Sequence, residues 1–420
     1  MDEVIGLFII ADDFTGALDT GVQFAAKGIP TRVITDPAAD LARDWGDARV
    51  LVLDAETRHL PPLEAYDTVY RAARQAVEIG VPHLYKKTDS ALRGNVGAEL
   101  TAMMRAADCR ALPFLPAFPK MNRTTAGGVH YIEDKPVADS VFGRDPFEPV
   151  TESEVVRLLA LQSDEKSHIF PVGFDASALD SQEGILVFDA ETDADLARAG
   201  VLLKERGLLR VAAGCAGFGA VEQELLGFAD RACACEPHLL PGFAVVCGSV
   251  NPITKKQLDA AERAGFLRIT MACGEKMNPG YFRSPEGKEK LEKWHEAFRA
   301  NPCRIIDGND APGAESTIEW AAEHGISIDG IRVGISGAMG DIVSEIADWE
   351  EVGTLLITGG DTLLSCMARM GVSELTPVAE LYPGVVLSRF VRNGKTRLVI
   401  SKSGGFGEES LFVDLAEKCK

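Results

Sequence analysis

The sequence predicts an α/β protein of two domains, each with a mainly parallel sheet flanked by helices. Short, continuously apolar runs alternate along the chain with longer segments of 3.6-residue periodicity, a pattern typical of strands buried between two helical layers. The length of 420 residues fits two domains of about 100–200 residues each. The pattern breaks near Phe228–Gly242, where proline, glycine and charged residues gather, so we expect domains at 1–230 and 240–420.

The individual elements follow from where apolar runs and periodic segments begin and end. In the first domain, apolar runs predict strands at Leu7–Ala11, Thr31–Thr35, Val50–Leu53, Ala111–Leu115, Ile185–Phe188 and Val211–Ala213. Helical periodicity predicts helices at Leu63–Ile79 and Glu152–Leu161, and at Lys255–Ala264 in the second domain. The strands expected in the second domain are Ala244–Cys247, Ile331–Ile335, Leu355–Thr358 and Leu398–Ser401.

Composition and charge exclude several classes of protein. A net charge of −20 argues against a general nucleic-acid role, which needs a basic footprint. The nine cysteines show no zinc-ligand spacing, which predicts reduced thiols without a metal. The chain opens acidic, unlike a signal peptide, and no apolar run approaches the roughly 20 residues that span a membrane. We therefore expect a cytoplasmic protein.

Two carboxylates directly follow the first predicted strand. The apolar run Leu7–Ala11 leads into Asp12 and Asp13, and a helix comes next. In open α/β sheets ligands bind at the carboxyl ends of strands, so these carboxylates fall where a ligand would bind. Helix capping by Asp12, Asp13 or Thr15 is the alternative. Two adjacent carboxylates after a fully apolar strand favour function.

A second candidate site is the polar segment Tyr85–Asn95. It concentrates three cations in an acidic chain and precedes a helix expected to begin near Val96, where the helix N-terminus favours an anion. A solvated loop with Asp89 or Ser90 as a cap is the alternative. The candidate ligand-binding residues of this segment are Lys87, Thr88, Asp89, Ser90 and Arg93.

Two further arginines lie in loops that follow predicted strands. Arg58 comes after Val50–Leu53, and Arg123 lies in a proline-rich loop after Ala111–Leu115. Arginine suits a carboxylate ligand because its guanidinium bonds in a bidentate fork. His130, beside the Arg123 loop, is the one histidine that we single out for testing.

In the second domain, three glycine-rich turns each follow a predicted strand. Glycines let backbone N–H groups approach a phosphate closely, and a helix N-terminus favours its charge. The set predicts a nucleotide site, although neither a Walker A loop nor a dinucleotide fingerprint is present. Packing turns are the alternative. The candidate cofactor-binding residues are Ser249, Gly359, Gly360, Asp361, Thr362, Gly404 and Gly405.

These motifs, taken in order, resemble those of the four-carbon acid sugar kinase family. Ile10–Ala17 resembles the family's opening "ADDxTGA", and Lys87–Asn95 its "KxDSxLRGN" segment. Further similar blocks are Pro116–Pro119 with Arg123–Thr125 and Gly128, then Gly248–Ser249, Gly359–Thr362, Pro383–Val385 and Lys402–Gly407. Two departures stand out: Val250 and Asn251 delay the proline after the Gly-Ser turn, and Ala91 stands where many members have threonine.

The resemblance implies a sugar-acid-binding first domain, an ATP-binding second domain and an active site in the interdomain cleft. It implies phosphorylation of a hydroxyl of threonate, erythronate or 3-oxo-tetronate, with Mg²⁺ on the phosphates and its protein ligands left open. By motif, the implied substrate positions are Asp13, Arg58, Lys87, Thr88, Asp89 and Ser90. The implied ATP positions are Ser249, Gly359, Gly360, Asp361, Thr362 and Gly405. Because of the two departures, no single acid is assigned.

The expected mechanism uses both signs of charge. Arg58, Lys87 and Arg93 would hold the carboxylate of the acid, and Asp13 or Asp89 would accept the proton of the attacking hydroxyl, with Asp13 preferred. The partners are expected to be the sugar acid and ATP, with no nucleic acid or membrane, and a homodimer is left open. A sugar-acid sensor without turnover, or another enzyme of sugar-acid metabolism, remains the alternative.

Overall fold

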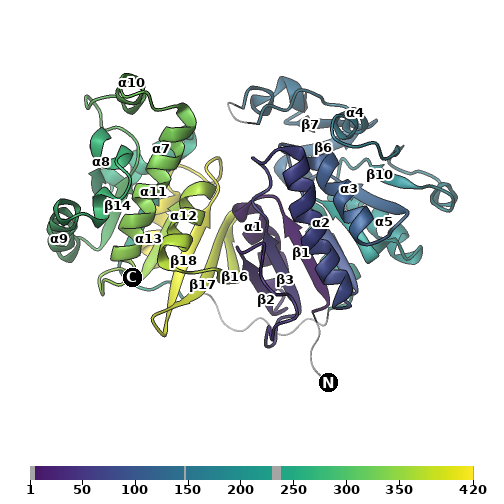
Figure 1. The fold of residues 1–420 in the computed structure, drawn as a ribbon, viewed down its shortest axis with the longest axis horizontal. Coiled ribbons are helices and arrows are strands. Elements are labelled where there is room, and N and C mark those ends of the chain that lie inside the picture. Colours follow the sequence, from purple (N-terminus) through teal and green to yellow (C-terminus); the bar gives the residue numbers. More distant parts are fainter. Residues whose placement is uncertain (1–4, 146–147, 229–237, 420) are drawn as a thin grey trace. The chain divides into compact units, whose positions relative to one another are not determined.

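The computed structural model describes residues 5–145, 148–228 and 238–419 (Figure 1). The chain divides into two compact units, Met1–Cys233 and Ala234–Lys420. The boundary expected between residues 230 and 240 falls mainly in 229–237, outside the described residues, as do Cys233 and Cys235. The seven described cysteines are free thiols. Within the described part of the chain, no helix combines the length and apolar character of a membrane span.

The first unit is built on a fully parallel sheet of eight strands. Apolar residues fill β1, β3 and β10, whose five positions are all buried, as expected for strands covered on both faces. From edge to edge the sheet runs β2 (Thr31–Ile34), β3 (Val50–Asp54), β1 (Leu7–Ala11), β4 (His83–Lys87), β11 (Val211–Gly214), β5 (Ala111–Leu115), β10 (Gly184–Phe188) and β9 (Ser167–Phe170).

The strand order places a topological switch point at β1. The chain builds β2 and β3 on one side of β1 and then crosses to β4 on the other. At such a point the connections leave a crevice at the carboxyl ends of the strands, where ligands bind in open α/β sheets. Asp12 and Asp13 follow β1 at this end of the sheet.

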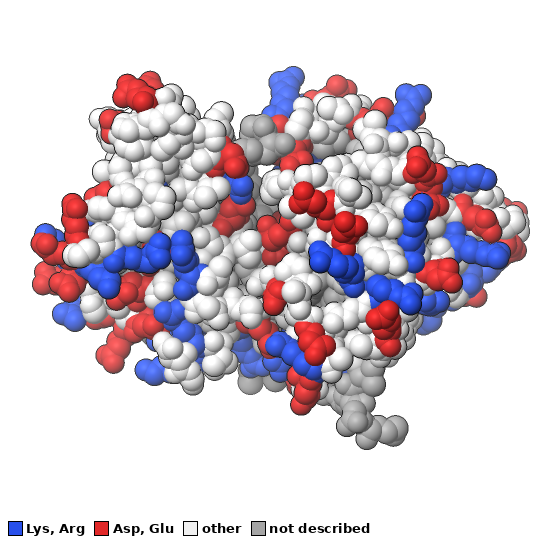
Figure 2. Space-filling model, in the orientation of Figure 1, with Lys and Arg blue, Asp and Glu red and all other residues white. Residues whose placement is uncertain are grey.

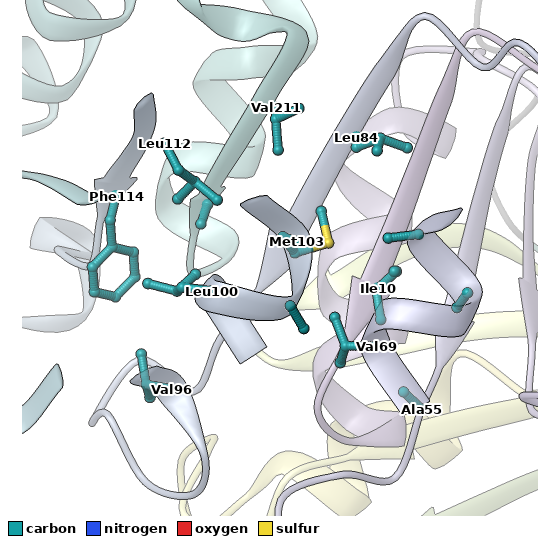
Figure 3. Packing of buried hydrophobic residues seen from close by; sticks show 14 of the residues in the cluster. Ile10, Ala55, Val69, Leu84, Val96, Leu100, Met103, Leu112, Phe114 and Val211 are labelled. Atoms are coloured by element: carbon teal, nitrogen blue, oxygen red, sulfur yellow. The ribbon is translucent and has the colours of Figure 1, made fainter. Parts of the chain in front are cut away.

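Two helical layers cover the sheet of the first unit. One layer packs α1 (Phe14–Ala25) on α6 (Ala216–Leu225) and α6 on α5 (Asp193–Glu205). The other layer packs α2 (Pro62–Glu78) on α3 (Val96–Ala106) and α3 on α4 (Val155–Ala160). Figure 3 shows the core beneath α2 and α3, where Val69 lies near Ile10 and Leu100 lies near Phe114.

A small antiparallel sheet continues from β5. It consists of β6 (Arg123–Ala126), β7 (Val129–Ile132) and β8 (Lys135–Pro136). Reciprocal backbone hydrogen bonds between Thr125 and Ala190 tie it to the chain after β10. Short 3-10 helices join these parts: η1 (Pro119–Met121), η2 (Val137–Asp139), η3 (Val141–Arg144), η4 (Ala176–Leu179) and η5 (Leu208–Arg210).

The second unit has a mixed sheet of seven strands. Five are parallel, in the order β13 (Leu267–Thr270), β14 (Cys303–Asp307), β12 (Phe243–Cys247), β15 (Thr354–Thr358) and β18 (Lys395–Lys402). The long strands β17 (Val385–Arg392) and β16 (Glu374–Tyr382) extend it in antiparallel fashion. The mainly parallel α/β fold predicted for both domains is therefore confirmed.

Helices also cover this second sheet. Against one face, α7 (Pro252–Arg263) packs with α13 (Leu411–Glu417) over a core that contains Phe243, Val245 and Ile400. A second pair packs α11 (Ile328–Ile346) on α12 (Gly360–Met370). The remaining helices are α8 (Cys273–Met277), η6 (Tyr281–Arg283), α9 (Pro285–Ala300) and α10 (Thr317–Glu323).

One predicted strand is wrong. Ile331–Ile335 lies inside the helix α11 rather than in a sheet. The run Ile-Arg-Val-Gly-Ile has β-branched residues, but Ser327 caps the helix by accepting the N–H of Gly330 (3.1 Å), and proline is absent from the next 19 residues. Burial of residues such as Met339, Ile342 and Ile346 then outweighs the strand preference of the first turns, because β propensity depends strongly on context.

Candidate functional site

The two carboxylates that follow β1 are held in different ways. Asp13 is the N-cap of α1, where its Oδ1 accepts the N–H of Gly16 (3.1 Å) and its Oδ2 accepts the Thr15 hydroxyl (2.5 Å). Asp12 is buried, and Lys87 Nζ at the end of β4 donates to its Oδ1 (3.3 Å). A side chain at position 16 would collide with Lys87 Nζ, so the glycine is required by this close approach.

Arg58 is the centre of the cluster. Its Nε donates to Asp12 Oδ2 (2.8 Å), and its Nη2 lies 2.7 Å from both Asp12 Oδ2 and Asp13 Oδ1 and 3.6 Å from Asp89 Oδ1. The backbone N–H of Arg58 also donates to the Asp12 carbonyl (3.2 Å). One buried guanidinium therefore joins three carboxylates from two separate loops.

The Asp89 loop supplies a second guanidinium. Arg93 bonds Asp89 in a bidentate fork, from Nε to Oδ2 and from Nη2 to Oδ1, each at 2.9 Å, the geometry that makes such pairs strong. Its Nη1 also donates to Asp145 Oδ2 (3.3 Å). Asp89 accepts the N–H of Ala91 as well (3.1 Å). Both oxygens of Asp89 are thus engaged within the protein.

Arg123 differs from the other cations of the cluster. Its Nη1 donates to Ser90 Oγ, and its guanidinium lies over the Phe142 ring, 5.2 Å from the centroid. Among the described residues, no carboxylate oxygen lies within 4 Å of it, whereas Arg58, Lys87 and Arg93 each have at least two carboxylate partners. Burial lowers the pKa of Arg123 from its ordinary value, the direction expected of a cation that lacks a counter-ion.

The charge network fixes the protonation of its acids. Burial alone would raise the pKa of Asp13, but Arg58 and Lys87 outweigh it and hold that pKa well below its usual range. Asp89 behaves likewise: burial opposes ionisation, while Arg93 and Arg58 keep its pKa well below the ordinary value. Both carboxylates are therefore ionised at neutral pH. The Lys87 pKa is raised, because Asp12 and Asp13 outweigh burial.

A buried polar layer, missed in the sequence, supports the cluster from below. Lys86 Nζ lies 3.2 Å from Glu99 Oε2, with both side chains essentially inaccessible. Glu99 also accepts the Thr57 hydroxyl, and Asn95 Nδ2 donates to the Thr57 and Leu60 carbonyls (2.8 Å each). These bonds hold the loop that carries Arg58. The charge and spacing of Lys86 and Glu99 give no sign of this pairing, since β4 and α3 meet only in the folded chain.

His130 connects the small sheet to the Asp89 loop. It is fully buried, with Nε2 2.9 Å from the Ser90 carbonyl and Nδ1 3.1 Å from Thr125 Oγ1. The contact with a carbonyl makes Nε2 the donor, so Nδ1 accepts the hydroxyl proton in the neutral tautomer. Burial lowers the pKa of His130 from 6.5 to about 4. We infer that it is a neutral structural link beside the site.

This lowered pKa predicts an acid sensitivity of the first unit. Because the unfolded chain binds a proton near pH 6.5 and the folded one only near pH 4, the contribution of His130 is complete above about pH 6.5 and is lost as the pH falls towards 4. The loss should approach about 3 kcal/mol. Urea unfolding at pH 7 and pH 4.5 should show a smaller pH effect in His130→Gln than in the wild type.

The half-buried His168 supplies the control for this experiment. His168→Gln should keep the full pH dependence of the wild type, because His168 lies in the edge strand β9 rather than in the core. Equal pH dependence in the wild type and His130→Gln would contradict the expectation.

The sequence-predicted residues of the first unit therefore come together. Asp12, Asp13, Arg58, Lys87, Asp89 and Arg93 form one ion-pair network, and Ser90 joins Arg123 to it. Thr88 is buried, and its hydroxyl has no partner among the described residues. Figure 2 shows acidic and basic side chains interspersed over the drawn face, in keeping with a cationic cluster that is local and buried.

The three glycine-rich turns of the second unit also converge. A side chain at Gly248 would collide with Thr362 Oγ1, and one at Gly404 would place its Cβ 2.7 Å from Ser249 Oγ. Gly359, at φ 105°, precedes α12 and would bring a Cβ to 3.7 Å from the Ser249 N–H nitrogen. The turns after β12, β15 and β18 thus surround Ser249. At Gly248 and Gly404 the lack of a side chain is thus required by close packing, and glycine-rich backbone before a helix also suits phosphate oxygens.

The carboxylate of Asp361 is not free, because an arginine pairs with it. It lies in the first turn of α12 and pairs with Arg332 Nη1 (2.7 Å). Asp307, at the end of β14, pairs with Arg268 Nη2 (2.7 Å). In the described ranges, no group of three or more His, Cys, Asp or Glu side chains is arranged to hold a metal ion. Mg²⁺ commonly binds through phosphates, water and one or two carboxylates, a mode that needs no group of three protein ligands.

Comparison with known proteins finds a family match for each half of the chain. Residues 7–221 match the family model described as "Sugar-binding N-terminal domain", and residues 244–412 match "Nucleotide-binding C-terminal domain". A D-threonate kinase of Salmonella typhimurium is 29% identical over 420 residues, covering 97% of each chain. A D-erythronate kinase of Heliobacterium modesticaldum is 26% identical, covering 94% of this chain and 93% of its own. A 3-oxo-tetronate kinase of Escherichia coli is 30% identical over 61% of this chain and 69% of its own.

Two solved structures share the fold. A crystal structure from Salmonella typhimurium LT2, provisionally called a tRNA synthase, superposes with a TM-score of 0.79 at 21% identity and covers 99% of both chains. A Haemophilus influenzae protein superposes with a TM-score of 0.72 at 22% identity, over 98% of this chain and 99% of its own. At these identities the likeness establishes the fold alone.

Proposed function

Because the chain belongs to the four-carbon acid sugar kinase family, we propose that it phosphorylates a four-carbon sugar acid with ATP. The acid belongs to the threonate, erythronate or 3-oxo-tetronate class named by the curated relatives. In this proposal residues 1–230 bind the acid and residues 240–420 bind the nucleotide. The transfer needs the acid and the nucleotide to meet in a space that excludes water.

The observation that carries the proposal is the unpaired guanidinium of Arg123. A cluster of balanced ion pairs has little reason to attract another anion, because each cation is already neutralised. Arg123 is the described cation of the cluster without a carboxylate partner, and burial lowers its pKa. An organic carboxylate would supply the missing counter-charge and raise the pKa of Arg123 again. The acid of a sugar acid fits this requirement, whereas a neutral sugar does not.

The sequence led us to expect that Arg58, Lys87 and Arg93 hold the substrate carboxylate. Their existing ion pairs favour different roles for the cations. In this proposal Arg58, Lys87 and Arg93 orient the three aspartates Asp12, Asp13 and Asp89 towards the substrate hydroxyls. Arg123, together with Ser90, binds the substrate carboxylate. Thr88, whose buried hydroxyl lacks a partner among the described residues, completes the proposed substrate set.

The turns around Ser249 would bind the triphosphate. We propose that the backbone N–H groups of Gly360, Gly404 and Gly405 and the hydroxyls of Ser249 and Thr362 hold phosphate oxygens, with the N-terminus of α12 adding favourable potential. The Gly359 N–H already donates to the Lys402 carbonyl (3.3 Å), so Gly359 would serve the turn through its backbone conformation. Asp361, paired with Arg332, would shape this end of α12. Mg²⁺ bound to the phosphates would neutralise the charge that develops during transfer.

The proposal predicts a specific defect for Arg123→Met. Loss of one charge-assisted contact is expected to raise KM for the sugar acid by about 10- to 100-fold, while KM for ATP stays within about twofold. Steady-state assays of ADP release, with each substrate varied in turn, measure both constants. The matched control is Arg110→Met, an exposed arginine that precedes β5 at the opposite end of the sheet, and it should behave like the wild type.

A screen of ATP consumption over four-carbon sugar acids of defined configuration tests the function as a whole. We expect ADP release to depend on one or a few of these acids and to be absent with the matching neutral sugars. Binding of both ATP and an acid without any ADP release would instead indicate a sensor, and the kinase proposal would be wrong.

A further inference from the structure

The turn that follows β18 is held from inside by three buried side chains. We call residues Ser403–Glu408 the β18 turn. Lys402 Nζ donates to the carbonyls of Ser403 and Gly404 (3.1 Å each), and Thr254 Oγ1 donates to the Gly404 carbonyl (2.7 Å). Gln257 Nε2 donates to the next carbonyls, those of Phe406, Gly407 and Glu408, at 2.9–3.0 Å. Lys402, Thr254 and Gln257 are all fully buried.

This arrangement fixes the direction of the N–H groups on the other side of the turn. In a planar trans peptide the carbonyl of one residue and the N–H of the next point in opposite directions, and no described peptide bond is cis. Since the Ser403 and Gly404 carbonyls point inward to Lys402, the N–H groups of Gly404 and Gly405 point outward. Neither N–H has a hydrogen-bond acceptor among the described residues. Ser249 lies beside this turn, since a Cβ at Gly404 would come to 2.7 Å from Ser249 Oγ.

The ammonium of Lys402 is fully used within the protein. Its three N–H bonds meet three acceptors: the Ser403 carbonyl, the Gly404 carbonyl and Thr254 Oγ1 (3.2 Å). A lysine that bound a phosphate directly would have to give up one of these bonds and leave a buried carbonyl or hydroxyl unpaired. The geometry therefore separates this lysine from the kind that reaches a phosphate as a point charge.

We propose that Lys402, supported by Thr254 and Gln257, is a positioning residue that keeps the Gly404 and Gly405 N–H groups aimed at a nucleotide phosphate without touching it. The inference rests on the proposed function, because it takes the space beside Ser249 as the phosphate site. A buried cation behind the turn would thus maintain the conformation in which the turn binds phosphate.

The ionisation of Lys402 agrees with this role. Burial lowers its pKa to about 8 and outweighs the opposing influence of the Cys247 thiol. Cys247 is itself neutral, since burial raises its pKa to about 12, and no carboxylate lies within 4 Å of Lys402 among the described residues. Above about pH 8 the amine keeps only two N–H bonds for three acceptors. Phosphates bound in front of the turn favour the charged form, so they should raise the pKa again.

A calorimetric titration with ATP–Mg²⁺ at pH 7 tests the role of Lys402. Lys402→Met, which keeps the apolar stem and removes the donor, should weaken ATP binding by about 10- to 100-fold and leave sugar-acid binding unchanged. Lys256→Met, an exposed lysine of α7, controls for the loss of one charge and should bind ATP like the wild type. Because sugar-acid binding reports on the first unit, fluorescence of Trp294, Trp320 and Trp349, all in the second unit, is used to show that the variant is folded. Equal ATP affinity in the wild type and Lys402→Met overturns the inference.

A second test measures proton uptake by the wild type when ATP binds. Because the free protein loses the Lys402 proton above about pH 8 and the bound form keeps it, ATP binding should take up part of a proton between pH 8 and 9.5, and affinity should fall as the pH rises through this window. Titrations in two buffers of different ionisation enthalpy measure the uptake, and Thr254→Val should reduce it. Binding without proton uptake overturns the inference, whereas absence of ATP binding at pH 7 overturns the proposed function itself.

Discussion

Replacing Arg58 by methionine is expected to abolish turnover, with a loss of kcat/KM of at least about 10³-fold, and to destabilise the first unit by about 3–5 kcal/mol. Arg58 Nη2 lies 2.7 Å from Asp12 and Asp13 and 3.6 Å from Asp89. Without the guanidinium, three buried carboxylates face one another with only Lys87 and Arg93 to balance them. The pKa values of Asp13 and Asp89 would rise, and the loops that the three carboxylates anchor would separate.

The readouts are ADP release and urea unfolding followed by a probe in the first unit. Arg71→Met, an exposed arginine of α2, serves as the control and should change neither. The double variant Arg58→Met/Asp12→Asn should recover part of the stability but none of the activity, because it removes one of the buried charges that has lost its counter-ion. A stable and active Arg58→Met enzyme would contradict the role of Arg58 as the centre of the cluster.

Asp13→Asn is expected to lower kcat by about 10²–10⁴-fold, the usual contribution of a general base, with KM for ATP nearly unchanged. Asparagine caps helices about as well as aspartate, so α1 should keep its N-terminus. Asp13 is the more accessible of the two candidate bases, with 17% of its side chain exposed against 8% for Asp89. Asp89 is also held by the bidentate Arg93, which leaves it poorly placed to accept a proton.

The protonation of Asp13 gives this experiment a second readout. Because Arg58 and Lys87 hold the pKa of Asp13 well below its usual range, the base form is present throughout the working pH range. The kcat profile should therefore show no acid limb from Asp13 above about pH 4. A weak base of this kind suits phosphoryl transfer through a loose transition state, where positioning outweighs proton abstraction. If both Asp13→Asn and Asp89→Asn keep most of kcat, the assignment of the base is wrong.

The strand-end residues of the first unit were predictable because the physics that places them is local. An apolar strand followed by Asp12 and Asp13, or by Lys87 and Asp89, puts polar groups at the carboxyl edge of a parallel sheet whatever the rest of the chain does. The glycines at 248, 359 and 404 were predictable for the same reason. Their convergence around Ser249 follows from the parallel order of β12, β15 and β18.

What escaped prediction depends on contacts between distant segments. The pairing of Lys86 with Glu99 and of Asp361 with Arg332 arises only when helices dock, so sequence spacing carries no trace of it. Ile331–Ile335 was misassigned because five residues cannot distinguish a strand from the first turns of a capped helix. Lys402 was noticed only as part of a glycine-rich turn, since its inward direction is a property of the folded sheet.

Lys86 and Lys87 are adjacent in the chain, but their side chains have different roles. Successive residues of a strand point to opposite faces, so Lys86 reaches Glu99 beneath the site while Lys87 reaches Asp12 within it. A substitution at position 86 is thus expected to impair folding. Growth at a lower temperature or stabilising substitutions elsewhere could offset this defect. A substitution at position 87 is expected to impair catalysis, and added stability would not restore the activity.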